Sequence, residues 1–504
     1  MKKKKILLVS FIIILATVIN LFAGMISVCA EGAEPTYGGG SGTETDPYKI
    51  STADHLRELA SYTNGCTESN GDTTKGKYYE LQNDIAIGEG TTQADWTPIG
   101  IINVNQTTAP TTFKGHFNGN GYTISGFKID KTTTKNDMVM GLFGAIEKDG
   151  CTIKNLRVAN ATITVEMARN AGAIVGLMNW KSTVSGCSTA NDVVIKAIGT
   201  HTHDPKLGGI VGYIHEQGVV EYCENNASVI IESTNYSTAY AAGIAGGSAA
   251  TIKNCVNKGT VTVKAFDGKK TSVYAAGIVG QLNPWTKLVA TVENCINYAT
   301  VTNEAVGTES NIYYASGIVA HVTGTSTSNR VFKNNFNLGK IEAGSVGQIV
   351  GAFGSTTSYE FDGNYATKGL GWTFADDDGL GMSGMSTILQ SEILANTNYL
   401  AAVTALDTKL KFELGAYTLP TGFEEKDPEI PSYDNLFDNE EENEDDNKTN
   451  NKKNNTTETT ASDNTTEAET VKNEGGCGST IGLAVFPIVG IIGAIALASK
   501  KKEY

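Results

Sequence analysis

The chain has 504 residues, of which 40% are hydrophobic and 18% charged, with 56 glycines, 8 cysteines and a formal net charge of −15. This length and apolar content allow a large hydrophobic core, and the excess of acid argues against a nucleic-acid partner. No Cys-x-x-Cys pair or zinc-type histidine cluster is present, so the sequence predicts no metal and no cofactor.

Residues 1–30 have the three parts of an export signal. Lys2–Lys5 form a basic start, the apolar run Ile6–Phe22 follows, and Val28-Cys29-Ala30 places small residues before a cleavage site. We expect cleavage after Ala30. A lipoprotein signal at Cys29 is the alternative, which Val28 disfavours because such sites take Gly or Ala before the cysteine.

Residues 31–135 are predicted to form an N-terminal cap and the first β coils. A helix is expected over 51–62, with Ser51 as its cap and Leu56 and Leu59 on its apolar face. Such a helix would shield the exposed edge of the first coil. Strands are expected at about 78–87, 112–118 and 121–130.

One phrase recurs through residues 136–370, most clearly as Gly277-Ile278-Val279-Gly280. Its last residue falls at positions 144, 176, 212, 246, 280, 320 and 351, which are 31 to 40 residues apart. A period of this size indicates a solenoid or a propeller. Short Thr/Val/Ile strands joined by Gly and Asn turns favour the solenoid, because a propeller blade needs four strands.

A second column of residues follows the phrase in each repeat. Its members are Leu156, Cys187, Cys223, Cys255, Cys295, Phe336 and Tyr365. Thr, Val and Ile then alternate, as in a strand with one buried face. Equivalent positions of stacked coils lie ~4.8 Å apart. We therefore expect an interior ladder of apolar side chains and free thiols, with disulfides as the alternative.

The sequence thus predicts an all-β fold, a right-handed parallel β-helix (solenoid) with an N-terminal helix cap. Gly141-Leu142-Phe143-Gly144 and its relatives resemble the GLUG repeats of bacterial cell-surface proteins, and residues 40–124 are similar to the region that introduces such repeats. The resemblance covers roughly residues 36–370. It implies an exported surface protein and no settled activity.

The repeat pattern ends near residue 370. Residues 371–423 are predicted to form a C-terminal cap that contains a helix over Thr387–Val403. The next region, 424–476, is predicted to be a disordered acidic linker. Its residues 424–474 contain 17 acids and 5 lysines, hence −12 of the net charge of −15. Such a segment cannot bury enough apolar surface to fold and extends by self-repulsion.

Residues 477–504 are predicted to anchor the chain in the cytoplasmic membrane with the ectodomain outside. The apolar stretch Ile481–Ser499 can cross a hydrocarbon core of ~30 Å, and Lys500–Lys502 would remain cytoplasmic. Gly475-Gly476-Cys477 resembles the start of some bacterial C-terminal sorting tails, which would make Cys477 a processing site. We favour the alternative, a plain transmembrane helix with an interfacial cysteine.

Two polar clusters are weighed as metal sites and set aside. The segment His201-Thr202-His203-Asp204 lacks an identifiable third ligand. Asp376–Asp378 lacks the alternating spacing and closing glutamate of a calcium loop. We expect both to be solvated turns.

The predicted function is non-catalytic: display at the bacterial surface and binding of an extracellular glycan or of a host or bacterial surface protein. Because aromatic rings stack on sugars, four residues are put forward as ligand contacts: Trp96, Trp180, Tyr213 and Trp285. A β-helical polysaccharide lyase or glycoside hydrolase is the first alternative, but the acids do not recur at one phase of the repeat, so no catalytic residue is named. A structural envelope component is the second.

Overall fold

The computed structural model describes residues 35, 37–65, 73–102, 111–131, 139–147, 150–166, 170–200, 204–235, 238–265, 272–285, 287–304, 312–325, 327–343, 345–353, 358–367, 385–388 and 390–413. These all belong to the unit formed by residues 1–426. The predicted signal peptide, acidic linker and C-terminal anchor with Cys477 lie outside the described residues, as do His201–His203 and Asp376–Asp378. Within the described part, no helix is long and apolar enough to cross a membrane.

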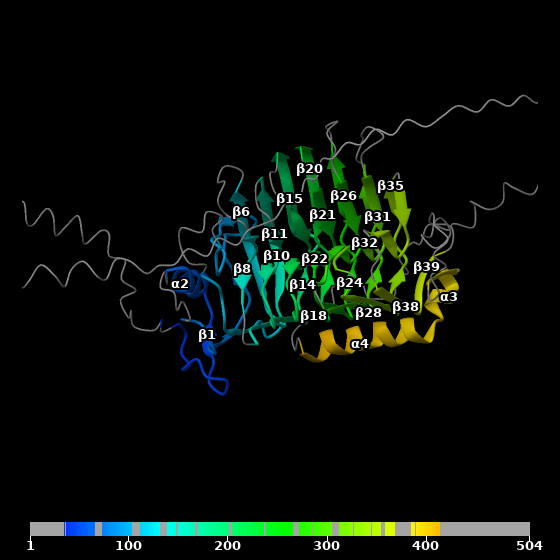
Figure 1. The fold of residues 1–504 in the computed structure, drawn as a ribbon. Helices are drawn as coiled ribbons and strands as arrows, with labels where there is room; N and C mark the ends of the chain where they lie inside the picture. Colours follow the sequence, from blue (N-terminus) through cyan, green and yellow to red (C-terminus); the bar gives the residue numbers. More distant parts are fainter. Residues whose placement is uncertain are drawn as a thin grey trace, which may run out of the picture. The chain divides into compact units, whose positions relative to one another are not determined.

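Four parallel sheets run side by side along the chain (Figure 1). The ten-stranded sheet contains β1 (Tyr48–Ile50), β2 (Tyr78–Leu81), β5 (His116–Asn118), β9 (Thr152–Lys154), β13 (Thr183–Ser185), β18 (Val219–Glu221), β23 (Thr251–Lys253), β28 (Val289–Glu293), β33 (Asn329–Lys333) and β38 (Ser358–Asp362). The sixteen-stranded sheet contains β3 (Ile85–Ala86), β4 (Ala94–Asp95), β6 (Thr123–Lys131), β10 (Arg157–Val165), β14 (Ser188–Thr189), β15 (Val194–Thr200), β19 (Glu224–Asn225), β20 (Ser228–Asn235), β24 (Val256–Asn257), β25 (Val261–Ala265), β29 (Ile296–Asn297), β30 (Val301–Asn303), β34 (Phe336–Asn337), β35 (Ile341–Ala343), β39 (Asn364–Thr367) and β40 (Met385–Ile388).

Two seven-stranded sheets complete each coil. The first contains β7 (Val139–Met140), β11 (Asn170–Gly172), β16 (Lys206–Gly208), β21 (Thr238–Ala242), β26 (Ser272–Ala276), β31 (Ile312–Ser316) and β36 (Ser345–Gly347). The second contains β8 (Phe143–Ile146), β12 (Val175–Met178), β17 (Val211–Ile214), β22 (Ala245–Ser248), β27 (Val279–Leu282), β32 (Val319–Val322) and β37 (Val350–Phe353). Each strand pairs in parallel with its equivalent in the next coil, which confirms the predicted all-β solenoid.

The recurring glycine phrase forms the corner between the two seven-stranded sheets. Only Gly209 and Ile210 separate β16 from β17. A side-chain carbon on Gly212 would lie 2.4 Å from the carbonyl oxygen of Gly176 and 2.6 Å from the amide nitrogen of Ala171. No side chain fits at that distance, so the sharp corner requires glycine. The second residue of the phrase, isoleucine in every copy except that of Leu142, turns inward and is buried, as at Ile244.

A ladder of buried asparagines runs through the interior beside this corner. The Nδ2 of Asn225 donates to Oδ1 of Asn257, Asn257 to Asn297, and Asn297 to Asn337, each at 2.9 Å. All four side chains are fully buried. The first glycine of each phrase makes room for them, since a side-chain carbon on Gly243 would lie 2.1 Å from Asn257. Because every amide is paired, the polar ladder is compatible with a dry core.

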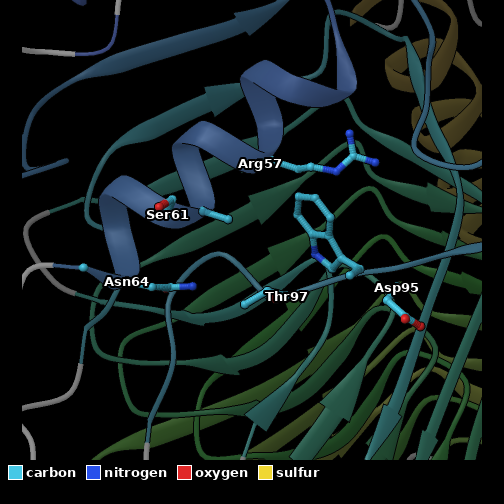
Figure 2. Close-up of a pocket in the computed structure, with 8 residues that line it drawn as sticks. Arg57, Ser61, Asn64, Asp95 and Thr97 are labelled. Carbon is cyan, nitrogen blue, oxygen red and sulfur yellow. The ribbon is translucent and has the colours of Figure 1, made fainter.

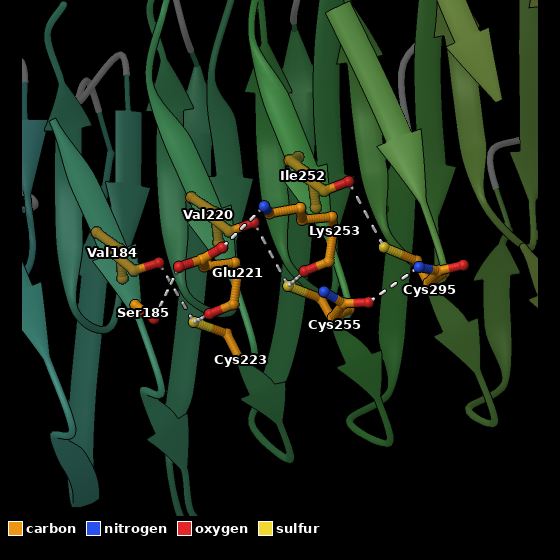
Figure 3. Close-up of polar contacts among 11 residues, drawn as sticks. Val184, Ser185, Val220, Glu221, Cys223, Ile252, Lys253, Cys255 and Cys295 are labelled. Carbon is orange, nitrogen blue, oxygen red and sulfur yellow. Dashed lines mark hydrogen bonds and ion pairs between the residues drawn. The ribbon is translucent and has the colours of Figure 1, made fainter. Parts of the chain in front are cut away.

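The cysteine column is an interior ladder, as predicted (Figure 3). Cys187, Cys223, Cys255 and Cys295 are all buried and free. The thiol of Cys255 donates to the carbonyl oxygen of Val220 in the preceding coil at 3.8 Å and to that of Lys253 at 3.3 Å. Burial raises the thiol pKa of Cys187 and Cys255, which keeps both protonated and unreactive.

The predicted continuation of this column through Phe336 and Tyr365 is wrong. Phe336 pairs with Ile296, the residue after Cys295, and Tyr365 pairs with Phe336. A shift of one residue moves a side chain to the other face of the sheet. The column continues instead through the buried Asn335 and Asn364, whose side chains form a 2.8 Å hydrogen bond.

Helix α2 (Ala53–Asn64) lies at the first end of the stack, beside β1 (Figure 1). It packs Leu56 and Leu59 into the core. Its cap is Thr52, whose hydroxyl accepts from the amide of His55 at 3.2 Å, and not Ser51 as the sequence suggested. The predicted helix itself is confirmed.

The single helix expected over Thr387–Val403 is wrong in part. Met385–Ile388 forms strand β40, which pairs with β39, and two helices follow, α3 (Gln390–Leu394) and α4 (Thr397–Glu413). Helix α4 runs along the flank of the stack, below β18, β28 and β38 (Figure 1). Its Tyr399 packs with Ile296 and Phe336 and shares a 2.6 Å hydroxyl–hydroxyl hydrogen bond with Tyr298.

Candidate functional site

Three of the four predicted ligand contacts meet around one histidine. The ring centroid of His215 lies 6.5 Å from that of Trp180, 5.1 Å from Tyr213 and 5.8 Å from Trp285. All three contacts are edge-on, with ring planes at 90°, 88° and 72°. Together with Glu216, the next residue, these side chains are called the aromatic site below.

Stacking of the coils brings these residues together from distant parts of the sequence. Trp180, His215 and Trp285 occupy the turns that follow β12, β17 and β27, at the same corner of the first, second and fourth of four successive coils. The intervening turn consists only of Ala249 and Ala250, between β22 and β23. Because that turn carries no bulky side chain, Trp285 reaches across one coil to His215.

The aromatic site combines exposed rings with the polar groups of Tyr213 and His215, both of which are uncharged near neutral pH. Trp180 and Trp285 are 49% and 50% exposed. Burial raises the pKa of Tyr213 to about 12, although a hydrogen bond from Trp285 lowers it in part. Burial also lowers the pKa of His215. Near neutral pH the site therefore presents an uncharged phenol and an uncharged imidazole.

Two buried polar atoms of the aromatic site have no hydrogen-bond partner among the described residues. They are Nδ1 of His215 and Oε1 of Glu216. An unpaired buried polar atom costs roughly 1–3 kcal/mol, so ligand hydroxyl groups that reached these atoms would recover that cost. Trp180, Tyr213 and Trp285 were predicted from the sequence, but His215 and Glu216 were not, although they directly follow Tyr213-Ile214.

The ring of Tyr213 packs against residues of neighbouring coils. A side-chain carbon on Gly247, the residue paired with Tyr213 in the next coil, would lie 2.8 Å from the Tyr213 ring. The ammonium of Lys206 lies 5.6 Å from the centroid of Tyr213 and 5.3 Å from that of Tyr240. Gly247 therefore leaves space for the ring of Tyr213, and the ammonium of Lys206 stabilises that ring by a cation–π contact.

The corner beneath is filled by stacked rings that are largely inaccessible. Tyr240 and Tyr274 are 3% and 4% exposed and stack at 5.0 Å. His321 stacks on Tyr274 at 4.3 Å, and its Nδ1 lies 3.2 Å from the hydroxyl of Tyr240. The hydroxyl also accepts from Nε2 of Gln281 at 3.0 Å. These residues support the aromatic site and do not form its surface.

The turn that carries Trp285 is held by a buried arginine. Arg330 is fully buried and donates to the carbonyl oxygens of Thr323, Thr325 and Ser328, at distances from 2.6 to 3.2 Å. The hydroxyl of Ser328 in turn donates to the carbonyl oxygen of Pro284 at 3.2 Å. Arg330 thus positions the residue before Trp285 through one intermediate side chain.

Trp96, the fourth predicted contact, lies elsewhere. It is 4% exposed, and its indole donates to the carbonyl oxygen of Leu142 at 3.1 Å. The structure corrects the expectation of an exposed contact, because the indole belongs to the core. One side of it lines a cavity of about 480 Å³ below α2 (Figure 2).

The polar groups around this cavity are already used within the protein. Arg57 contacts Asp54 at 2.8 Å and the carbonyl oxygen of Ile87 at 3.0 Å. Asn64 donates to the carbonyl oxygen of Pro98 at 2.8 Å and accepts from the amide of Gly100 at 2.9 Å. The bonds from Arg57 to Ile87 and from Asn64 to Pro98 and Gly100 attach α2 to the first coils, and the cavity is best explained as part of that junction.

Metal ligands do not gather in the part of the chain that the structure describes. No group of three or more His, Cys, Asp or Glu side chains comes within binding reach of one point there.

Comparison with known proteins gives partial similarities. No family model matches the chain. Over 182 residues it is 31% identical to a protein of Evansella cellulosilytica named as a Gly-rich membrane protein, covering 35% of this chain and 18% of that protein. Over 181 residues it is 29% identical to halomucin of Haloquadratum walsbyi, covering 35% of this chain and 2% of halomucin. The chain therefore corresponds to a small part of each relative.

One solved structure is also similar. A protein from Bacteroides ovatus named as an immunoglobulin A1 protease aligns with 20% sequence identity and a TM-score of 0.43, covering 73% of this chain and 91% of that one.

Proposed function

We propose that this protein is a non-catalytic bacterial surface protein that binds an extracellular glycan through the aromatic site. The observation that carries the proposal is the pair of half-exposed tryptophans, Trp180 and Trp285, around the unpartnered polar atoms of His215 and Glu216. Ring faces bind the apolar faces of sugars, and unpaired acceptors bind their hydroxyl groups.

Surface display is supported by the sequence and by the names of the relatives. The N-terminal export signal and the apolar segment Ile481–Ser499 are the proposed route and anchor. The two relatives are named as a Gly-rich membrane protein and as halomucin. In this proposal the right-handed β-helix with GLUG-type repeats stands outside the cytoplasmic membrane on the acidic linker.

A glycan fits the aromatic site better than a protein surface does. A stable protein interface buries ~800 Å² on each partner around a central apolar cluster. The described exposed large apolar residues are few, and the polar ring of His215 lies within contact of both Trp180 and Trp285. Small, spaced rings with hydrogen-bonding groups between them are typical of a carbohydrate site.

A glycoside hydrolase is the alternative that one observation favours. The carboxylate oxygen of Glu216 is buried and unpartnered beside the aromatic rings. A hydrolase would use such a group as an acid, base or nucleophile. New chain ends in a bound polymer, lost in Glu216→Gln, would replace the binding proposal with this one.

The test is a glycan-binding assay on the full-length protein in detergent. We expect Trp180→Ala/Trp285→Ala to weaken binding at least tenfold, because both stacking surfaces are removed. Leu400→Ala is the matched control, since Leu400 is 48% exposed on α4, away from the aromatic site. Equal binding by the tryptophan variant and the wild type would refute the proposal, as would retention of no glycan by the wild type.

A further inference from the structure

We propose that the glycan bound at the aromatic site is acidic, carrying carboxylate or sulfate groups that two lysines recognise, Lys181 and Lys287. This inference rests on the proposed function and specifies the chemical class of its ligand.

The two lysines flank the aromatic site in corresponding turns. Lys181 directly follows Trp180, and Lys287 is two residues after Trp285. Both are exposed, and both have left-handed backbone conformations, with φ of 58° and 64°. Gln217 holds the same conformation, φ 61°, in the turn of His215. Each of the three turns thus contains one residue with a left-handed backbone, which is a lysine at the two ends of the site and an uncharged glutamine in its middle.

Neither lysine is neutralised by the part of the protein that the structure describes. Other lysines on the outside of the solenoid pair with a carboxylate of a neighbouring coil. These pairs are Lys196–Glu232 at 2.6 Å, Lys253–Glu221 at 3.1 Å and Lys264–Glu304 at 3.3 Å. No described carboxylate forms an ion pair with Lys181 or Lys287. Their ammonium groups are therefore available to an anionic ligand.

The spacing favours an extended ligand that lies along the stacking axis. The turns of Lys181 and Lys287 are three coils apart, about 14 Å at the strand spacing of a sheet. A single sugar does not span that distance, but an oligosaccharide does. The carboxylate of Glu216 lies between the two lysines in the sequence of coils and would repel an anion at the centre. Acidic groups of the ligand therefore belong at the two ends, with a sugar hydroxyl over His215 and Glu216.

The test compares polymers of different charge on the full-length protein. Immobilised hyaluronan, which carries carboxylates, and chondroitin sulfate, which carries both acids, are compared with neutral dextran at low and high ionic strength. We expect an acidic polymer to bind, and to bind more weakly at high salt because exposed charge pairs are screened. Lys181→Gln/Lys287→Gln should lower its affinity roughly three- to tenfold.

The control has the same change in net charge elsewhere on the protein. Lys253→Gln/Lys333→Gln alters two lysines of the ten-stranded sheet and should leave binding unchanged. An equal loss in both double variants would overturn the inference, because binding would then follow net charge alone.

The remaining outcomes separate the two proposals. Binding of dextran that depends on Trp180 and Trp285 but not on Lys181 and Lys287 would overturn the acidic ligand and leave the proposed function standing. Binding of an acidic polymer that is indifferent to the lysine pair would also overturn the inference. Failure of the wild type to retain any of the polymers would count against both proposals.

Discussion

His321 shows how one buried polar residue supports the aromatic site without touching a ligand. Its imidazole stacks on Tyr274, and its Nδ1 meets the hydroxyl of Tyr240. The ammonium of Lys206 forms cation–π contacts with the rings of both Tyr240 and Tyr213. Burial lowers the pKa of His321 to about 4, so the imidazole is neutral in the folded protein at neutral pH.

The lowered pKa of His321 predicts a loss of stability in acid. In the unfolded chain the imidazole has its ordinary pKa of 6.5. Between that value and about 4 the unfolded state binds more protons, so folding is disfavoured as the pH falls. The stabilisation is complete above pH 6.5 and decreases toward pH 4, by about 3 kcal/mol in total.

Chemical unfolding of the wild type and of His321→Phe across this pH range measures the effect. The substitution keeps a stacked ring but cannot take up a proton. We expect the free energy of unfolding of His321→Phe to fall less steeply with acid than that of the wild type. Parallel curves for the two proteins would contradict the assignment.

For single residues, the sequence shows the chemistry of a side chain but not whether that side chain is exposed. Trp180, Tyr213 and Trp285 were put forward, with Trp96, because aromatic rings stack on sugars, and only the structure shows that Trp96 is buried. The roles of His215 and Arg330 were not predicted, since they depend on neighbours from other coils. A lone histidine or arginine in a repeat is otherwise explained as a solvated residue.

Helix α4 is the element whose position differs most from expectation. It packs on the outer face of the sixteen-stranded sheet, where Val256, Ile296 and Phe336 of successive coils form an apolar stripe. The sequence showed the apolar residues of the stripe, but one-residue ambiguity in register assigned Phe336 to the interior. The strand β40 was missed because its partner β39 is provided only by the folded stack.

Replacement of Tyr399 is expected to loosen α4 selectively. Tyr399→Ala removes the ring packed on Phe336 and the hydrogen bond to Tyr298, a loss of about 3 kcal/mol for a buried aromatic residue. Amide hydrogen exchange over residues 397–413 should accelerate, while exchange in β24 and β29 stays slow. Leu400→Ala, on the exposed side of the helix, serves as the control and should leave exchange unchanged. Uniform acceleration throughout the stack would show that α4 is not a separate unit.

For the whole molecule, the parallel stack of coils was predictable because the glycine phrase recurs at regular intervals along the sequence. The glycine phrase fixes the corner, and alternating Thr, Val and Ile fix the strands. The asparagine ladder was not predicted. The asparagine of Cys-x-Asn can form its hydrogen bond only when the next coil places an identical side-chain amide beside it. In a solenoid each coil contacts only its neighbours, so such a ladder adds side-chain hydrogen bonds to the strand pairing that already links adjacent coils.

Interruption of the ladder is expected to weaken more than one coil. Asn297→Ala removes the only described acceptor of the Nδ2 of Asn257 and one of the two donors to the Oδ1 of Asn337, which keeps the amide of Gly339, a loss of about 2–4 kcal/mol. Hydrogen exchange should accelerate in the strands on both sides, β24 and β34, as well as in β29. Thr262→Ala, a partly exposed position of β25, is the control. A change restricted to β29 would mean that the ladder does not couple neighbouring coils.

The two-residue turn at Ala249 and Ala250 has a consequence for how such a protein can change by duplication. A coil added elsewhere in the stack lengthens the protein by one strand spacing, ~4.8 Å, and repeats the same corner. A coil added between those of His215 and Trp285 separates the two rings and removes their contact. Copies of coils outside the stretch from Trp180 to Trp285 therefore lengthen the protein without changing the aromatic site, whereas coils inserted within that stretch separate its residues.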